Sequence, residues 1–187
     1  IYTLSLHDAL PIFDYTLDKD FYLRIATELN LKRLLVGDME RVYEIGRLFR
    51  NEGMDASHNP EFTNIEIYHA YSDLRGIGDL TEKMIRNTAK EVTGSAIITY
   101  GDREINFKDP FKWISMNDLI KEKCGIDFKA IKTYEEAKKL ADEKGLHLDK
   151  FKNTIGYVMN EFFEEFCQAD LIQPTFVYEY PIEVSPL

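Results

Sequence analysis

The chain has 187 residues, of which 44% are apolar, and this is enough for one substantial hydrophobic core. Its 33 acidic residues outnumber its 23 basic ones. This excess argues against the chain being the main nucleic-acid-binding part of a protein, because such surfaces use lysine and arginine. No apolar run reaches the length of a membrane span. Two cysteines do not make a disulfide framework, so we expect a protein of the reducing cytoplasm.

The first twelve residues, IYTLSLHDALPI, show neither the alternation of a strand nor the apolar stripe of a helix. They also lack the basic first segment of a signal peptide. We interpret residues 1–12 as a non-native leader and exclude them from the fold. Sequencing the locus upstream of Phe13 tests this hypothesis.

The first predicted elements are a strand over residues 21–26 and a helix over residues 28–36. Thr27 is a favourable N-cap, and Gly37 fits the position that follows a helix. Glu28 then lies in the first helical turn, where an acid is favourable for the helix dipole. Spacing alone therefore indicates a solvated acid at this position.

The central feature of the sequence is a predicted β-hairpin over residues 42–71. Alternation along its second strand gives an ordinary core face, made of Thr63, Ile65, Ile67 and Tyr71. The other face carries an aromatic ring, an amide, a carboxylate and a phenol: Phe62, Asn64, Glu66 and Tyr68. A sheet needs no such row for stability, so we interpret this face as a binding surface.

The loop of this hairpin, residues 51–60, is too long for a tight two-residue turn. Loops held by a rigid hairpin commonly carry function. Arg50 lies where the first strand meets the loop, and a guanidinium there can offer paired donors to a phosphate or a carboxylate. We therefore expect Arg50 to bind an anionic group and Glu66 a cationic one.

The rest of the chain is predicted to be scaffold. We expect an amphipathic helix at 79–92, a hairpin of residues 97–100 and 104–107, helices at 117–123, 134–144 and 154–167, and a strand at 174–180. No Cys/His cluster has metal-ligand spacing, and there is no Walker-type phosphate loop.

The segment FRNEGMDASHNPEF, followed by TNIEIY, resembles the second signature motif of class II aminoacyl-tRNA synthetases in its lysyl-tRNA synthetase form. The HNPEF block with the E-x-Y after it is more specific to this group of enzymes than the general class II pattern. The similarity covers roughly residues 17–187. It implies an α+β fold in which residues 13–187 form part of a catalytic domain: an antiparallel sheet flanked by helices, with a helical insertion at about 115–169 and a returning strand at about 174–180.

The resemblance implies ATP-dependent activation of lysine to lysyl-adenylate and transfer of the lysyl group to tRNA(Lys). Arg50 would bridge the α-phosphate of ATP and the lysine carboxylate, as the catalytic residue. Glu52 and His58 would lie at the adenine and the distal phosphates, and Phe62 would stack on the adenine. Asn59 would fix the loop.

The lysine substrate would be bound by Glu28, Glu66 and Tyr68, with Glu28 at the α-ammonium and Tyr68 near the side-chain ammonium. Magnesium is expected with ATP, but the acids that bind it would lie mostly beyond Leu187, so no metal ligand is named. The family also implies a homodimer and an anticodon-binding domain, which this chain lacks. We therefore expect the chain to be a truncated fragment that is inactive alone.

Two alternative functions stay open. A related ligase attaches a lysine-type group to a translation elongation factor and shares the HNPEFT block, although LRIATELNLKRL and EYPIEVSPL favour the tRNA enzyme. The other alternative is a non-catalytic paralogue or an inert fragment. The intact motif residues Arg50, Glu52, Glu66 and Tyr68 argue against degeneration of the parent gene.

Overall fold

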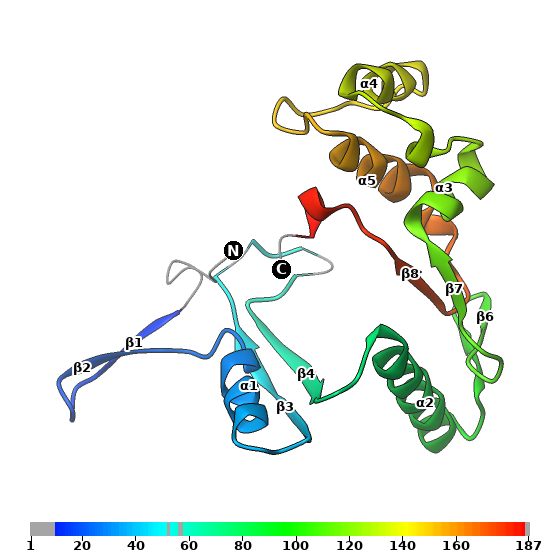
Figure 1. Ribbon diagram of the computed structural model, residues 1–187. Helices are drawn as coiled ribbons and strands as arrows, with labels where there is room; N and C mark the ends of the chain where they lie inside the picture. The colour runs from blue at the N-terminus through cyan, green and yellow to red at the C-terminus, as the bar shows by residue number, and fades with distance from the viewer. Residues whose placement is uncertain (1–9, 52, 56–57, 186–187) are drawn as a thin grey trace. The chain divides into compact units, whose positions relative to one another are not determined.

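The structure, a computed structural model, describes residues 10–51, 53–55 and 58–185 (Figure 1). Contacts divide it into two compact units, Ile1–Ile77 and Gly78–Leu187. Within the described ranges, no helix combines the length and apolar character that crossing a membrane requires.

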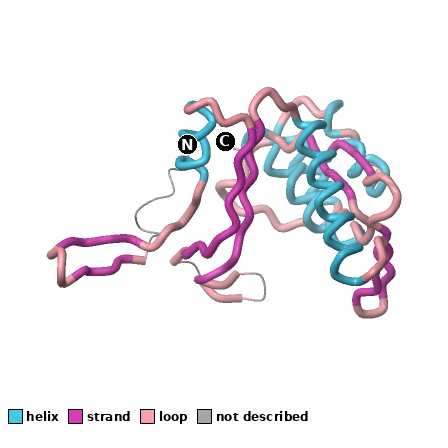
Figure 2. Tube along the Cα trace, turned by 90° about the horizontal axis from the view of Figure 1, so that it is seen from below, coloured by secondary structure: helices cyan, strands magenta, loops and turns pink. Residues whose placement is uncertain are grey.

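Unit 1 is built on a long antiparallel hairpin of β3 (Arg41–Phe49) and β4 (Glu61–His69), whose strands run side by side in Figures 1 and 2. The helix α1 (Glu28–Val36) packs against both strands. A shorter hairpin of β1 (Pro11–Asp14) and β2 (Lys19–Tyr22) comes first in the chain. The predicted long hairpin and first helix are confirmed.

The predicted leader overlaps this first hairpin, because Pro11 and Ile12 belong to β1. Most of that segment, residues 1–9, lies outside the described residues. Its non-native origin stays a hypothesis.

One face of the long hairpin is covered by α1. The register places Glu44 opposite Glu66, and residues two and four positions away share their face. On that face Val42 and Leu48 are buried, as is Leu31 of α1. The face that carries Glu66 is therefore the packed face of unit 1.

The opposite face, predicted to be the core face, is exposed, so this prediction is wrong. Tyr43 is 68% exposed, Ile45 62% and Ile65 37%. Alternation shows that two faces of a strand differ, but it does not show which one a helix covers. Here Leu31 brings α1 onto the face that also carries the polar row.

The segment that leads into α1 differs from the prediction in two ways. The strand predicted over residues 21–26 ends at Tyr22, and beyond it the backbone makes isolated bonds such as Phe49 N–H to the Arg24 carbonyl (2.8 Å). Thr27 takes the N-cap position, but its backbone is near-helical (φ −106°, ψ −7°) and its hydroxyl makes no cap bond. Asp38, not Gly37, adopts the left-handed conformation after the helix (φ 72°).

Unit 2 begins within α2 (Leu74–Thr93), a helix that starts before the unit boundary and earlier than the predicted Asp79. The Asp73 carboxylate accepts the Gly76 N–H (2.8 Å) and so caps the extra turn. The remaining strands are β5 (Ile97–Tyr100), β6 (Arg103–Asn106), β7 (Lys112–Ser115) and β8 (Thr175–Tyr178). The remaining helices are α3 (Met116–Cys124), α4 (Tyr134–Glu143) and α5 (Ile155–Phe166), with short 3-10 turns η2 (Phe128–Ala130), η3 (Gln168–Asp170) and η4 (Ile182–Val184).

The core of unit 2 lies between the predicted helices, all three of which are confirmed. Met116 and Ile120 of α3 and Val158 and Phe162 of α5 are each 0% exposed. The helix starts are capped as their sequences indicate: for example, Thr133 and Glu136 form a capping box at α4. These helices therefore form a packed scaffold.

The predicted returning strand is confirmed as β8, but its partner β7 was missed, and the two run parallel. The other three strand pairs of the described residues are antiparallel. The α+β class is therefore confirmed, with four two-stranded sheets in place of one antiparallel sheet. The ring of Trp113 in β7 packs 4.3 Å from that of Phe176 in β8.

We expect Gly78→Ala to destabilise unit 2, because a Cβ at position 78 would overlap the indole of Trp113, which Phe176 holds from another side. Overpacking costs about 1–3 kcal/mol, and the helix propensity of alanine returns up to about 1 kcal/mol. The difference is a net loss of about 0–3 kcal/mol, and overlap with a rigid ring places it in the upper half of this range. Urea unfolding followed by Trp113 fluorescence measures it. Gly53→Ala, where a Cβ meets open space, is the control, and equal stability of the two variants would contradict the packing.

Candidate functional site

An acidic cluster forms where the start of α1 meets β4. One carboxylate oxygen of Glu66 accepts the backbone N–H of Thr27 (3.0 Å), and the other accepts the Tyr68 hydroxyl (3.1 Å). Glu28, the first residue of α1, is close enough to act on Tyr68 through its charge. The structure thus brings together the three residues that were predicted to bind a cation.

The pKa of Tyr68 is raised to about 12. Burial is the largest cause, followed by the hydrogen bond that the hydroxyl donates to Glu66 and by the negative charges of Glu28 and Glu66. Tyr68 is therefore a neutral hydrogen-bond donor at any physiological pH. Its hydroxyl therefore adds a polar group without positive charge to the cluster.

We expect Glu66→Gln to lower the pKa of Tyr68 toward its ordinary value of about 10. The substitution removes a negative charge and a charged acceptor, and both of these disfavour the phenolate. The ζ-carbon resonance of Tyr68, labelled with ¹³C and assigned by its loss in Tyr68→Phe, follows the titration between pH 8 and 12. Glu61→Gln, on the other face of β4, is the control, and an unchanged titration in Glu66→Gln would contradict the cluster.

The other end of the same face carries a cation. The guanidinium of Arg50, just beyond β3, lies 5.4 Å from the centroid of the Phe62 ring. Its Nε also donates to the Ile25 carbonyl (3.5 Å), and its backbone N–H donates to the Pro60 carbonyl (3.0 Å). Arg50 and Phe62 are therefore positioned together, as predicted from the sequence.

The same face also carries an ion pair that was not predicted from the sequence. The guanidinium of Arg24 pairs with Glu44 and donates to the Arg47 carbonyl (3.4 Å). It lies so close to Gly46 that a Cβ there would collide with it. Only the pairing register, which sets Glu44 opposite Glu66, reveals that Arg24 belongs to this face.

Asp55 holds the described part of the hairpin loop. The Asp55 carboxylate accepts the backbone N–H of His58 (2.8 Å) and contacts the His58 ring (2.8 Å), and the Asp55 N–H donates to the His58 carbonyl (3.2 Å). An aspartate that bonds to the backbone three residues ahead is a known turn signal. Asn59 is exposed, and Glu52 lies outside the described residues, so their roles stay predictions.

The face as a whole is polarised. Glu66 and Phe62 are four residues apart on one strand, which corresponds to roughly 13 Å. The acidic cluster lies at one end of that span and Arg50 at the other. Such a face suits an elongated ligand with an ammonium group at one end and an anion at the other.

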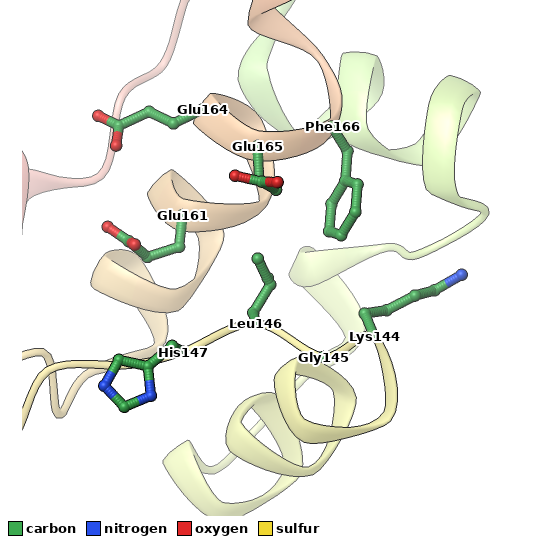
Figure 3. Close-up of a pocket in the computed structure, with 8 residues that line it drawn as sticks. All are labelled: Lys144, Gly145, Leu146, His147, Glu161, Glu164, Glu165 and Phe166. Atoms are coloured by element: carbon green, nitrogen blue, oxygen red, sulfur yellow. The ribbon is translucent and has the colours of Figure 1, made fainter.

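A hollow in unit 2 shares none of these residues. It has a volume of about 290 Å³ and lies between the loop after α4 and one side of α5 (Figure 3). Two of the carboxylates around it are already paired, Glu161 with Lys152 (2.6 Å) and Glu164 with Asn160 (2.9 Å). The described ranges also contain no group of three or more side chains that could hold a metal ion. The polarised face of unit 1 is therefore the candidate site.

Residues 10–187 match the sequence model of the tRNA synthetases of class II (D, K and N), and the chain belongs to this family. It is 58% identical over 168 residues to the lysine–tRNA ligase of Streptococcus suis, and 58% identical over 170 residues to that of Streptococcus agalactiae. It is 56% identical over 170 residues to the lysine–tRNA ligase of Streptococcus mutans. These alignments cover 90–91% of this chain but only 34% of each relative, so the chain spans about a third of their length.

Proposed function

We propose that the chain is the part of a lysine–tRNA ligase that binds lysine and ATP for the formation of lysyl-adenylate. The observation that carries the proposal is the polarised face of the hairpin, with Glu28, Glu66 and Tyr68 at one end and Arg50 at the other. The relatives that carry the name lysine–tRNA ligase support the same reaction.

In the proposed reaction, a carboxylate oxygen of lysine attacks the α-phosphorus of ATP, and the bond to the bridging oxygen of pyrophosphate breaks. No protein base is needed, because the attacking carboxylate is already ionised. The protein supplies position and charge. The guanidinium of Arg50 can donate to the carboxylate and to the α-phosphate at once, because its donors form a planar fork.

The adenine of ATP would stack on the ring of Phe62, which lies beside Arg50. His58, held by Asp55, would donate to the distal phosphates, together with Glu52 at the adenine. Asn59 would fix the loop. These assignments follow the resemblance, and the neighbourhood of Arg50 and Phe62 supports them.

The lysine substrate would be oriented by its ammonium groups. Each ammonium has three donors, and the carboxylates of Glu28 and Glu66 offer acceptors at one end of the face. The neutral hydroxyl of Tyr68 already holds Glu66, so the carboxylate is fixed before the ligand enters. A ligand with a neutral or acidic side chain lacks the side-chain ammonium that this end of the face would bind.

The remaining parts of the assignment are also proposals. Magnesium would neutralise charge on the phosphates of ATP, but the described residues offer no cluster of three or more side chains that fits it. Binding of tRNA(Lys) through an anticodon-binding domain, a homodimer and a cytoplasmic location follow from the family.

Transfer of lysine tests the proposal. The complete gene product that contains this chain is expected to attach radiolabelled lysine to tRNA(Lys) and not to tRNA(Asp). The isolated 187 residues are expected to be inactive, because they span only 34% of the relatives. Labelling of an elongation factor in place of tRNA would move the function to the related protein ligase, and labelling of neither would favour the non-catalytic alternative.

A further inference from the structure

The acidic cluster already has a cation beside it, and this cation belongs to the chain itself. The ammonium of Lys32, one turn after Glu28 on α1, forms an ion pair with the Glu28 carboxylate. The same ammonium lies 6.0 Å from the centroid of the Tyr68 ring, the distance at which a cation interacts with an aromatic face. Lys32 thus presents a primary ammonium on an alkyl chain to two of the three residues of the cluster.

We propose that Lys32 is an internal competitor of the substrate, whose ammonium occupies the cation position of the empty site and must leave when lysine binds. This inference rests on the proposed function, because it assumes that the ligand carries an ammonium group to Glu28 and Tyr68. The proposal adds Lys32, which is not one of the motif residues, to the residues that determine the affinity for lysine.

The chemistry of the pair allows such an exchange. The side chains of Lys32 and Glu28 are 53% and 39% exposed, so their ion pair is weak and screened by solvent. The lysine side chain is a flexible chain of four carbons, so its ammonium can move into water without unfolding any element. A ligand ammonium that also reaches Glu66 gains a second carboxylate, which Lys32 is not seen to contact. The ligand therefore displaces Lys32, but it binds with lower affinity than it would if Lys32 did not occupy the site.

The binding test compares Lys32→Met and Lys32→Arg with the unchanged complete gene product. We expect Lys32→Met to lower the Kd for lysine, measured by calorimetry without ATP, by about two- to fivefold, the range of an exposed ion pair. Lys32→Arg keeps the cation and should keep the Kd. Lys139→Met is the matched control, because Lys139 forms a similar exposed pair one helical turn from Glu143 on α4. A Kd that is unchanged or higher in Lys32→Met would overturn the proposal.

A second measurement follows the Lys32 side chain by NMR and does not depend on the activation of lysine. Reductive methylation with ¹³C keeps the charge of lysines, and the Lys32 signal is the one missing from Lys32→Arg. Because this signal lies near the Tyr68 ring, Tyr68→Leu should shift it, and saturating lysine should move it toward the position of a solvated side chain. An unmoved signal in both cases would overturn the proposal. If the wild-type protein shows no lysine-dependent activity while Tyr68→Leu shifts the signal, the proposed function fails and the internal ion position stands.

Discussion

Replacing Arg50 by alanine in the complete gene product is expected to lower kcat/KM for lysine activation by about 10³-fold. In the proposed reaction, the guanidinium of Arg50 donates to both the lysine carboxylate and the α-phosphate. It is positioned by the Ile25 carbonyl and the Phe62 ring. Under this proposal, the substitution removes the partner of both anions and leaves Glu28 and Glu66 in place. Lysine-dependent exchange of pyrophosphate into ATP measures the effect.

Two variants separate this role from a general loss of charge. Arg50→Lys keeps the positive charge but not the planar fork, so it should recover only part of the activity. Arg47→Ala removes a neighbouring exposed arginine that is paired with Glu61 on the other face of the hairpin, and its turnover should stay within about twofold of wild type. Near-normal turnover of Arg50→Ala would mean that the motif residue has another role.

Replacing Glu66 by glutamine is expected to raise the KM for lysine by about 30- to 150-fold, which corresponds to the loss of a desolvated charge partner worth 2–3 kcal/mol. The amide keeps the shape of the side chain and can still accept one of the bonds from Thr27 and Tyr68. The KM for ATP should change little, because Phe62 and Arg50 lie at the other end of the face. Steady-state kinetics with each substrate varied in turn measures both constants.

The control for Glu66 is Glu61→Gln on the same strand. Glu61 is paired with Arg47 and faces away from the cluster, so both KM values should stay near those of the wild type. Equal increases of the KM values for lysine and ATP in Glu66→Gln would instead indicate damage to the hairpin.

Much of the local structure could be predicted because it depends on residues near in sequence. The long hairpin follows from alternation, and the helices of unit 2 follow from caps such as Thr133 with Glu136. Glu66 and Tyr68 were singled out because polar groups occupy one face of the second strand, and Arg50 because it lies where the first strand meets the loop. Alternation along the strand was enough to place Glu66 and Tyr68 on the same face.

What could not be predicted depends on packing between distant segments. The choice of the covered hairpin face is made by Leu31, and the parallel pairing of β7 with β8 joins residues that are far apart in the chain. The Arg24–Glu44 ion pair could not be predicted for the same reason, because it joins two segments that are 20 residues apart in the chain. Lys32 is different: its spacing of four from Glu28 is a visible helical pair, and only the position of Tyr68 gives it a functional meaning.

The polarised face is proposed to bind an amino acid with a cationic side chain for activation by ATP. Amino-acid-dependent ATP–pyrophosphate exchange by the complete gene product tests it most directly, with lysine, β-lysine and aspartate compared under identical conditions. We expect strong exchange with lysine and none with aspartate, because aspartate would place a further carboxylate beside Glu28 and Glu66. A preference for β-lysine would instead indicate the ligase that modifies an elongation factor. Exchange with none of the three, or with aspartate alone, would contradict the account.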